Sequence, residues 1–297
     1  MLRHLHSEPH PPARVVVLGA GGFIARAVVR VLQAKGIPVL GLGRPGLDLL
    51  EPVAAGRLAT LLRSDDTLVF ASAKAPCKDS GMLRENLVMA EAVCVALKAR
   101  PVAHVIYISS DAVYKDSPGP LDEGSCAEPG SLHGVMHFAR EVALRAEFAG
   151  PLAIVRPTLV YGLEDPHNGY GPNRFRRLAG AGKEIVLFGE GEERRDHVDV
   201  EDVAALVCLI AQHRSQGVVN AVSGEVVSFR DLAQFAAAEF EPHVAVRGSP
   251  RSGPMPHDGY RPLANRAALQ AFPGFRFRSW REGLARVHAM QKKISPP

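Results

Sequence analysis

A glycine-rich turn near the start of the chain has the residue types and spacing of a phosphate-binding loop. The apolar run Val15–Leu18 leads into the pattern Gly-x-x-Gly-x-x-Ala, and a helical pattern follows at once. Gly19 would permit the tight strand-to-helix turn, Gly22 would let backbone approach a pyrophosphate, and Ala25 would let the helix lie close to the strand. The helix N-terminus would then offer free N–H groups to phosphate. The turn predicts a dinucleotide site, and an ordinary strand-to-helix turn is the simpler alternative.

Two histidines have the spacing of residues that work together. His133 and His137 are four positions apart, so a helix places both on one face. An imidazole has an unperturbed pKa of about 6.5, so His133 is suited to proton exchange with a hydroxyl or carbonyl near neutral pH. A zinc pair is the other chemistry for this spacing. It is disfavoured because position 134 is Gly rather than a Glu base and no obvious third ligand follows, so we predict no metal site.

The bulk composition excludes several classes of protein. The formal net charge is only +4 and the basic residues are spread, which argues against nucleic-acid binding. No apolar run approaches the roughly 20 residues of a membrane span, and the first residues lack the apolar core of a signal peptide. Four cysteines are scattered without a C-x-x-C pair. These features predict a reduced, cytoplasmic protein.

The first half of the chain alternates between strand and helix patterns. Near-continuous apolar strands joined by helices predict a parallel sheet covered on both faces, a doubly wound α/β fold of the Rossmann type. The expected strands are Val15–Leu18, Ile37–Leu42, Thr67–Ala71, Val102–Ile108 and Leu152–Arg156. The expected helices include Pro52–Arg63, Met82–Lys98 and His133–Phe148, the second with apolar residues every three or four positions.

The second half has a different texture and predicts a smaller C-terminal lobe. We expect a disordered lead-in over 1–12, a dinucleotide-binding domain over 13–161 and a substrate-binding lobe over 162–297, with segments near 198–221 returning to the main domain. The expected elements are a loop at Gly162–Asn173, helices at Val198–Ala211 and Ser228–Phe240, a strand at Gly217–Ala221, an irregular stretch at Arg247–Arg261, and two closing helices at Leu263–Ala271 and Trp280–Gln291. Ser228 and Asp231 have the spacing of a capping box.

Several motifs follow one another along nearly the whole chain. After Gly19–Ala25 they are VIYISSDAVY (Val105–Tyr114), HGVMHFARE (His133–Glu141), RPTLVYG (Arg156–Gly162), FGEGEERRDHVDVEDVA (Phe188–Ala204) and YRPLANRAAL (Tyr260–Leu269). In this order they make the chain resemble the extended short-chain dehydrogenases/reductases, the group of nucleotide-sugar epimerases, dehydratases and reductases.

The resemblance implies a nicotinamide dinucleotide, NADP or NAD. A NAD-specific site usually has Asp or Glu after the second strand, whereas this chain has Gly43 and Arg44 there. Arg44 is suited to a 2′-phosphate, which favours NADP, although a solvated surface arginine is the alternative. By resemblance the cofactor-binding residues are Gly19, Gly21, Gly22, Phe23, Ile24, Arg44, Asp48, Ala71, Ser72, Ala73, Asn86 and His137. Asp48 fits a helix N-cap equally well, and Asn86 fits an ordinary helix position.

The catalytic residues depart from the family pattern. The family uses a Tyr as acid/base, a Lys one helical turn later that lowers the pKa of the Tyr, and a Ser that orients the substrate oxygen. Ser110 matches the Ser, but His133 and His137 occupy the Tyr and Lys positions. Either His133 is a substitute acid/base, or the protein binds dinucleotide without the usual redox chemistry, or the acid/base is another residue. For that last alternative the candidates are Tyr170, Tyr161 and Asp111.

The resemblance also implies a nucleotide-activated sugar as substrate. Its diphosphate favours arginine, and Arg195 and Arg261 match the family, with surface ion pairing as the alternative. The candidate substrate-binding residues are Asp111, Asn168, Tyr170, Asn173, Arg195 and Arg261. The helices Met82–Lys98 and His133–Phe148 correspond to those of a four-helix homodimer interface in the family, although such a stripe also suits a core.

The expected activity is therefore that of an NAD(P)-dependent oxidoreductase, epimerase or dehydratase. A non-catalytic NAD(P)-binding protein with a regulatory or scaffold role is the competing hypothesis.

Overall fold

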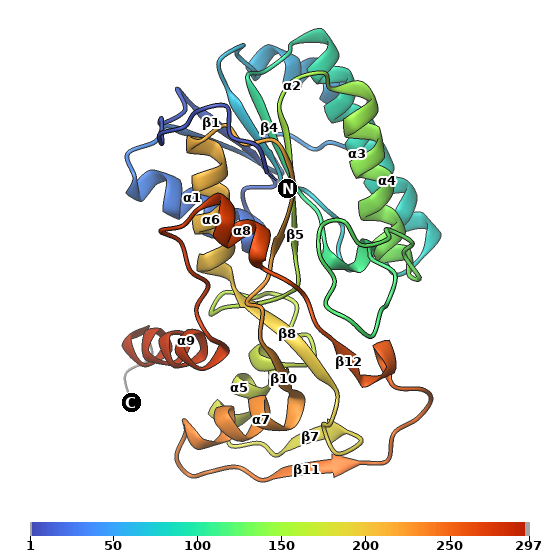
Figure 1. Cartoon of the computed structure of the whole chain (residues 1–297), viewed down its shortest axis with the longest axis vertical. Helices are drawn as coiled ribbons and strands as arrows, with labels where there is room; N and C mark the ends of the chain where they lie inside the picture. Colours follow the sequence, from blue (N-terminus) through green and yellow to red (C-terminus); the bar gives the residue numbers. More distant parts are fainter. Residues whose placement is uncertain (1, 295–297) are drawn as a thin grey trace.

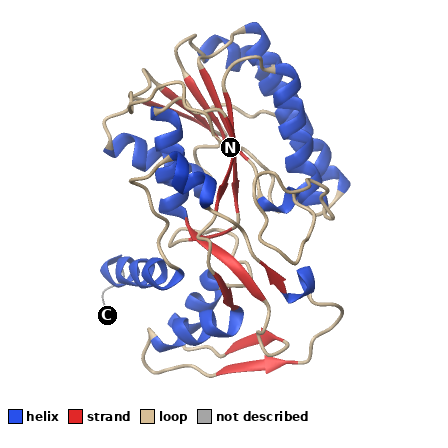
Figure 2. Ribbon diagram, in the orientation of Figure 1, coloured by secondary structure: helices blue, strands red, loops and turns tan. Residues whose placement is uncertain are grey.

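A six-stranded parallel sheet forms the centre of the larger part of the molecule. The computed structural model describes residues 2–294. The strand order is β2-β1-β3-β4-β5-β9 (Figures 1 and 2). The strands are β1 Val15–Leu18, β2 Val39–Leu42, β3 Thr67–Phe70, β4 His104–Ile108, β5 Leu152–Pro157 and β9 Gly217–Ala221. All adjacent pairs are parallel, and β1, β3 and β4 are buried along their whole length. The prediction of a Rossmann-type sheet is confirmed.

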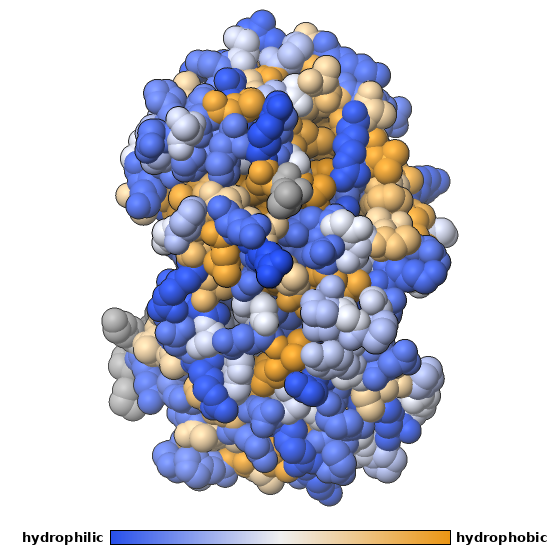
Figure 3. All heavy atoms as spheres, viewed as in Figure 1, coloured by the Kyte–Doolittle hydropathy of each residue, from blue (hydrophilic) through white to orange (hydrophobic). Residues whose placement is uncertain are grey.

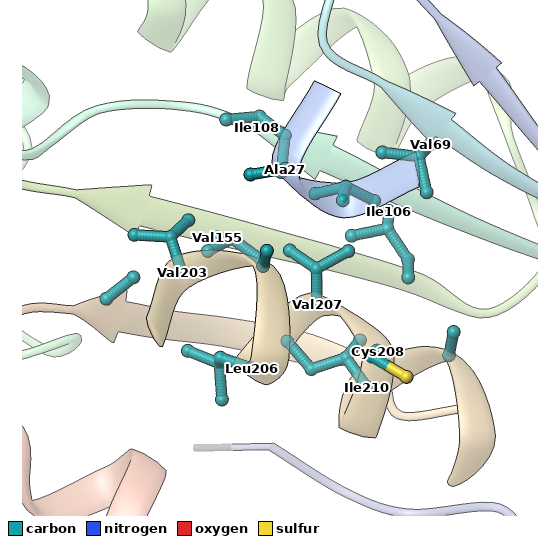
Figure 4. Close-up of a cluster of buried hydrophobic side chains, with 14 of the residues drawn as sticks. Ala27, Val69, Ile106, Ile108, Val155, Val203, Leu206, Val207, Cys208 and Ile210 are labelled. Atoms are coloured by element: carbon teal, nitrogen blue, oxygen red, sulfur yellow. The ribbon is translucent and has the colours of Figure 1, made fainter. Parts of the chain in front are cut away.

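Helices cover both faces of this sheet, which is why its strands are apolar on both sides. On one face lie α1 (Phe23–Ala34), α6 (Val200–Gln212) and the short α8 (Arg266–Ala271) (Figure 1). Figure 4 shows side chains of α6, among them Val203 and Val207, packed against the sheet. On the other face lie α2 (Ala54–Leu61), α3 (Ser80–Ala99) and α4 (Leu132–Glu147). Alternating residues of each strand therefore enter two separate cores.

A smaller lobe lies beyond the carboxyl ends of the main strands. Its sheets are β10-β8-β12, with β6 also paired to β8, and β11-β7. The strands are β6 Leu159–Tyr161, β7 Ile185–Phe188, β8 Arg194–Asp199, β10 Val226–Ser228, β11 Val246–Ser249 and β12 Tyr260–Arg261. The helices of this lobe are α5 Pro172–Gly180, α7 Phe229–Ala238 and α9 Trp280–Ile294, and a 3₁₀ turn, η2, spans Pro256–Gly259. Another 3₁₀ turn, η1 Asp111–Val113, follows β4 of the main sheet. The chain returns to the main sheet through α6 and β9 (Figure 1).

Capping explains where two of these helices begin. The Ser228 hydroxyl accepts a hydrogen bond from the backbone N–H of Asp231, so the predicted cap of α7 is confirmed. The expected helix Val198–Ala211 begins two residues late. Val198 belongs to β8, and the Asp199 carboxylate caps α6 by accepting from the Glu201 N–H.

The expected irregular stretch Arg247–Arg261 is partly regular. Residues of β11 pair in parallel with β7, beginning at Val246 and Ile185, and β12 pairs with β8. Composition rich in Pro and Gly did not reveal these pairs because the partner strands come from distant parts of the sequence.

The expected disordered lead-in is wrong over residues 3–10. The backbone of Arg3 bridges to Gln216 in antiparallel fashion, and the N–H groups of Leu5 and His6 donate to the His213 carbonyl. His4 completes the attachment through hydrogen bonds to the Ser215 hydroxyl and the Ala271 carbonyl. The segment is ordered because the link between α6 and β9 offers it backbone partners.

Among residues 2–294, no helix combines the length and apolar character needed to cross a membrane.

Candidate functional site

A cavity of about 580 Å³ opens where the carboxyl ends of the main strands meet the smaller lobe. Parallel strands bring the loops that follow them to one edge of the sheet, so residues far apart in sequence meet there. The wall comes from the start of α1, the loops after β3 and β4, the first turns of α4, the segment after β5, the loop before α5, and β8. Of the predicted site residues, the cavity is lined by Gly22, Phe23, Ile24, Ala71, Ala73, Ser110, Asp111, His133, His137, Tyr170, Asn173 and Arg195.

The glycine turn has the shape of an anion cradle. Gly19 has φ +80°, and a Cβ there would lie 2.8 Å from the Ser72 backbone, so only glycine fits. A Cβ on Gly21 would meet nothing within 4 Å, which leaves that side of the turn open. The first turn of α1 has no acidic residue and no side-chain cap. Its N–H groups are therefore free for a phosphate, and the residues fit a dinucleotide.

Arg44 lies next to this turn. The N–H groups of Gly19 and Ala20 donate to the Leu42 carbonyl at 2.7 and 3.1 Å, which brings the end of β2 against the turn. The Arg44 side chain is exposed and makes no ion pair with any of the residues that the structure describes. Asp48 closes a local turn by accepting from the Leu50 N–H. Asp48 is not a helix cap, because α2 begins only at Ala54.

Asn86 holds the loop after β3 and does not line the cavity. It is fully buried, its amide oxygen accepts from the Lys74 N–H, and its amide nitrogen donates to the Lys74 carbonyl. Ser72 also stays outside the lining, since its backbone packs under Gly19. Both residues shape the loop on which Ala71 and Ala73 face the cavity.

Ser110 and Asp111 follow β4 directly. The Ser110 hydroxyl accepts from the Ala112 N–H at 3.1 Å and so caps η1. It also lies 3.3 Å from the Asp111 carboxylate, to which it can donate. Asp111 in turn lies 3.4 Å from the Nε of Arg261. Ser110 is therefore held at the cavity wall by its own turn.

Gly134 decides how close α4 approaches this turn. A Cβ at Gly134 would lie 2.1 Å from the Ala112 carbonyl oxygen, so a side chain there would push the helix away. The missing Cβ lets the first turn of α4 press against η1. His133 and Ser110 therefore line the same cavity.

The two histidines are adjacent, with ring centroids 4.7 Å apart and planes at 88°. Nδ1 of His137 lies 2.8 Å from the Tyr107 hydroxyl, and Nδ1 of His133 accepts a long hydrogen bond of 3.4 Å from the Cys77 backbone N–H. Burial lowers the pKa of His137 well below its ordinary value, helped by His133 and Arg140. Burial also lowers the pKa of His133, against the nearby Asp111 charge, which raises it. Both rings therefore favour the neutral form near pH 7.

Arg140 is a fully buried cation that sequence reasoning missed. It donates to the Ser72 carbonyl, and its guanidinium carbon lies 4.2 Å from the Phe70 ring centre and 5.2 Å from that of Tyr107. No carboxylate pairs with it among the described residues. The sequence could have pointed to Arg140, because it lies three residues after His137 and a helix places both on one face.

β8 supplies the opposite wall. Arg195 and His197 alternate with Asp196 along the strand, so their side chains share one face, and both line the cavity. Sequence reasoning missed His197, whose Nδ1 lies 3.2 Å from the Arg195 carbonyl. Because a carbonyl only accepts, Nδ1 carries the proton.

The loop before α5 brings some predicted residues to the cavity and leaves others outside. The Tyr170 hydroxyl accepts from the Phe188 N–H, and the Asn173 amide oxygen accepts from the Gly162 N–H. Asn168 does not line the cavity, and its side chain bonds Arg177 instead. Tyr161 is buried outside the cavity, which leaves His133, Asp111 and Tyr170 as the acid/base candidates that face it.

Arg261 also lies outside the cavity lining. Its guanidinium is 3 % exposed, pairs with Asp116 and donates to the Asp111 carbonyl. The arginine thus braces the turn after β4 in this structure. Within the described chain, no three His, Cys, Asp or Glu side chains are grouped as a metal site would require.

Comparisons with known proteins agree with this architecture. Residues 15–222 match the family described as "NAD dependent epimerase/dehydratase family". The chain is 30% identical over 260 residues to dTDP-6-deoxy-L-talose 4-dehydrogenase (NAD(P)(+)) of Kitasatospora kifunensis, covering 78% of this chain and 81% of that one. It is 27% identical over 297 residues to ADP-L-glycero-D-manno-heptose-6-epimerase of Cupriavidus pinatubonensis, covering 87% and 88%. The structure of Thermus thermophilus UDP-glucose 4-epimerase with NAD superposes with a TM-score of 0.83 at 21% identity, covering 95% and 100%.

Proposed function

Because the chain belongs to the NAD-dependent epimerase/dehydratase family, we propose that it is an NAD(P)-dependent enzyme that acts on a nucleotide-activated sugar by reduction, epimerisation or dehydration. The observation that carries this proposal is a single cavity that joins three groups of residues. These are the start of α1, the pair Ser110 and His133, and Arg195 of β8. Cofactor, reacting atom and diphosphate would thus share one space.

A nicotinamide dinucleotide would lie with its pyrophosphate on the glycine turn. Its nicotinamide ring would supply or accept a hydride. The open side of Gly21 and the uncapped start of α1 support this placement. The exposed, unpaired Arg44 supports a 2′-phosphate and hence NADP over NAD.

Ser110 and His133 are the groups that we propose to hold the reacting oxygen. Ser110 is fixed by the η1 cap, and His133 is brought beside it by the close approach at Gly134. In this arrangement His133 directs a ring N–H at the oxygen and is the source of its proton, and His137 supports it from the next helical turn. Arg195 would bind the diphosphate, since within residues 2–294 a single 3.4 Å contact to Glu193 occupies its terminal nitrogens.

One observation favours the competing, non-catalytic reading. The site has neither a Tyr nor a Lys at the α4 positions, and both histidines there have lowered pKa values. A protein with this site would still bind a dinucleotide while lacking the usual acid/base. Turnover separates the two functions, because cofactor binding is common to both.

The exposed faces of α3 and α4 support a homodimer. Hydrophobic side chains that a lone domain would bury stay exposed there, and Figure 3 shows apolar atoms over these helices at the upper right. They are Leu87, Val88 and Val95 on α3 and Leu132, Val135 and Val142 on α4. Light scattering tests this: a dimer is expected, and Val95→Glu with Val142→Glu should yield monomers.

The decisive experiment measures binding first and turnover second. Calorimetry with NADP(H) and NAD(H) should detect a nicotinamide complex, and absence of binding to all four would refute both functions. Coupled absorbance assays with UDP-, dTDP- and GDP-sugars then test catalysis. Cofactor binding with no turnover or sugar binding across that panel would favour the non-catalytic protein.

A further inference from the structure

His133 is held in one tautomer by a backbone group. Its Nδ1 accepts from the Cys77 N–H, and a ring nitrogen that accepts carries no proton. In the neutral ring the proton therefore lies on Nε2. Protonation of Nδ1 would place its N–H against the N–H of Cys77. The Cys77 N–H therefore also disfavours the charged form of His133.

His137 is held in the same tautomer by a different group. Tyr107 is fully buried, and among the described residues Nδ1 of His137, 2.8 Å away, is the one hydrogen-bond acceptor recorded for its hydroxyl. Arg140 lies beside Tyr107 but has only donors, so it cannot take the hydroxyl proton. If Nδ1 donated, the Tyr107 proton would be buried without an acceptor, which is unfavourable. Tyr107 therefore donates, and the proton of His137 lies on Nε2.

The charged and titratable neighbours keep the pair neutral. His133 lies within the electrostatic influence of Asp111, next to His137 on its own helix and against the Cys77 loop. His137 faces His133, Tyr107 and the Arg140 cation. Burial, His133 and Arg140 disfavour a charge on His137, whereas the Asp111 carboxylate partly offsets the effect of burial on His133.

We infer that His133 and His137 are paired neutral N–H donors whose tautomers are set by the Cys77 backbone and the Tyr107 hydroxyl, and that the sugar group they take is a carbonyl oxygen. The choice of a sugar as ligand rests on the proposed function. The assignment of the two rings as N–H donors rests on the two contacts at Nδ1. Both rings line the cavity, and Ser110 adds a hydroxyl to the same wall.

The donor pattern explains the preference for a carbonyl. A carbonyl oxygen only accepts, so two N–H groups and a hydroxyl satisfy it, and a neutral imidazole can polarise it. A sugar hydroxyl brings a proton of its own that needs an acceptor. With Nδ1 occupied and Nε2 protonated on both rings, neither histidine offers one. The site is thus built for the keto form of a sugar, and Tyr107 is a positioning residue.

The tautomers are tested without substrate. Long-range ¹H–¹⁵N correlation spectra at pH 7 distinguish protonated from bare ring nitrogens, and His133→Gln and His137→Gln assign the two rings. We expect a bare Nδ1 and a protonated Nε2 in each. A bare Nε2 on either ring, or a doubly protonated ring, would overturn the inference.

A matched pair of variants tests the role of Tyr107. Tyr107→Phe should leave His137 free to populate both tautomers, while its fold is checked by thermal unfolding. Tyr114→Phe removes another buried hydroxyl, one that bonds Asn220 outside the cavity, and should leave the His137 spectrum unchanged. An unchanged His137 tautomer in Tyr107→Phe would show that the hydroxyl does not set it.

Sugar binding is tested with pairs that differ only in the oxidation state of C4. The 4-keto-6-deoxy derivatives of UDP-glucose, dTDP-glucose and GDP-mannose are each compared with the corresponding 4-hydroxy-6-deoxy sugars, with the reduced cofactor bound. For the nucleotide that binds, the keto form should bind about tenfold more tightly, and Tyr107→Phe should reduce that ratio. Equal or weaker binding of the keto form would refute the carbonyl assignment. Failure of every sugar would refute the proposed substrate class, while the ¹⁵N spectra would still decide the donor assignment.

Discussion

Glu141 of α4 and Arg156 of β5 form a bidentate ion pair inside the protein. Nε of Arg156 lies 2.9 Å from one carboxylate oxygen and a terminal nitrogen lies 2.6 Å from the other. The Ser109 hydroxyl donates to the same carboxylate at 2.6 Å. The Arg156 pair therefore ties the helix that carries His133 to β5, and the Ser109 bond ties the same helix to the end of β4, next to Ser110.

Loss of this carboxylate should destabilise the fold. Glu141→Gln leaves the Arg156 charge buried without a counter-charge, which is expected to cost about 3 kcal/mol or more. Chemical denaturation measures the loss. Glu147 lies on the same helix as Glu141 and forms a more exposed pair with Lys98 of α3, so Glu147→Gln should cost less than about 1 kcal/mol. Similar losses in both variants would contradict the structural role of Glu141.

The hydroxyl of Ser110 should matter for turnover and not for cofactor binding. Ser110→Ala removes one donor to the reacting oxygen, for which a loss of about 10²-fold in kcat is expected. Calorimetry should give an unchanged Kd for the dinucleotide. A kcat within a few-fold of the parent protein would remove Ser110 from the proposed site.

His133 can be tested by two replacements of similar size. His133→Phe removes the polar ring and should lower kcat by at least about 10²-fold. His133→Tyr restores a hydroxyl at the position where the resembled family has its acid/base, and it should retain more activity than the Phe variant. Unchanged turnover in His133→Phe would rule out His133 as proton carrier and favour Asp111 or Tyr170.

Cofactor selectivity should follow Arg44. Arg44→Asp replaces a cation beside the glycine turn with an anion, so NADP should weaken by about tenfold or more relative to NAD. Arg44→Gln should have an intermediate effect. The ratio of the two Kd values is the measurement, and an unchanged ratio would place the 2′-phosphate away from Arg44.

Acid should destabilise the protein through His104. This histidine is buried, its Nε2 bonds the Ser215 carbonyl, and burial lowers its pKa to about 4. The unfolded chain, with a histidine pKa of about 6.5, binds more protons between these values, so stability is lost as pH falls from about 6.5 to 4. The loss attributable to His104 is up to about 3 kcal/mol. Urea unfolding of the parent and His104→Gln at several pH values isolates it, and parallel curves would contradict the assignment.

Local sequence patterns were sufficient to predict the main sheet and the glycine turn at the start of α1. Val15–Leu18, Gly19 and the start of α1 are adjacent in the chain, so their apolar and glycine spacing carries the information directly. The Ser228 cap and the i, i+4 placement of the histidines are local in the same sense.

Tertiary packing decided which polar groups face the cavity and what each nitrogen of the histidines can do. Arg261 matched a family motif but forms an ion pair with Asp116. The side chain of Asn86 is hydrogen-bonded to the Lys74 backbone. The tautomers of His133 and His137 depend on Cys77 and Tyr107, which lie 56 and 30 positions away from them. Residue types and spacing determined that two imidazoles share a helix face. Only the fold, by burying a hydroxyl and a backbone N–H against them, decided where their protons lie.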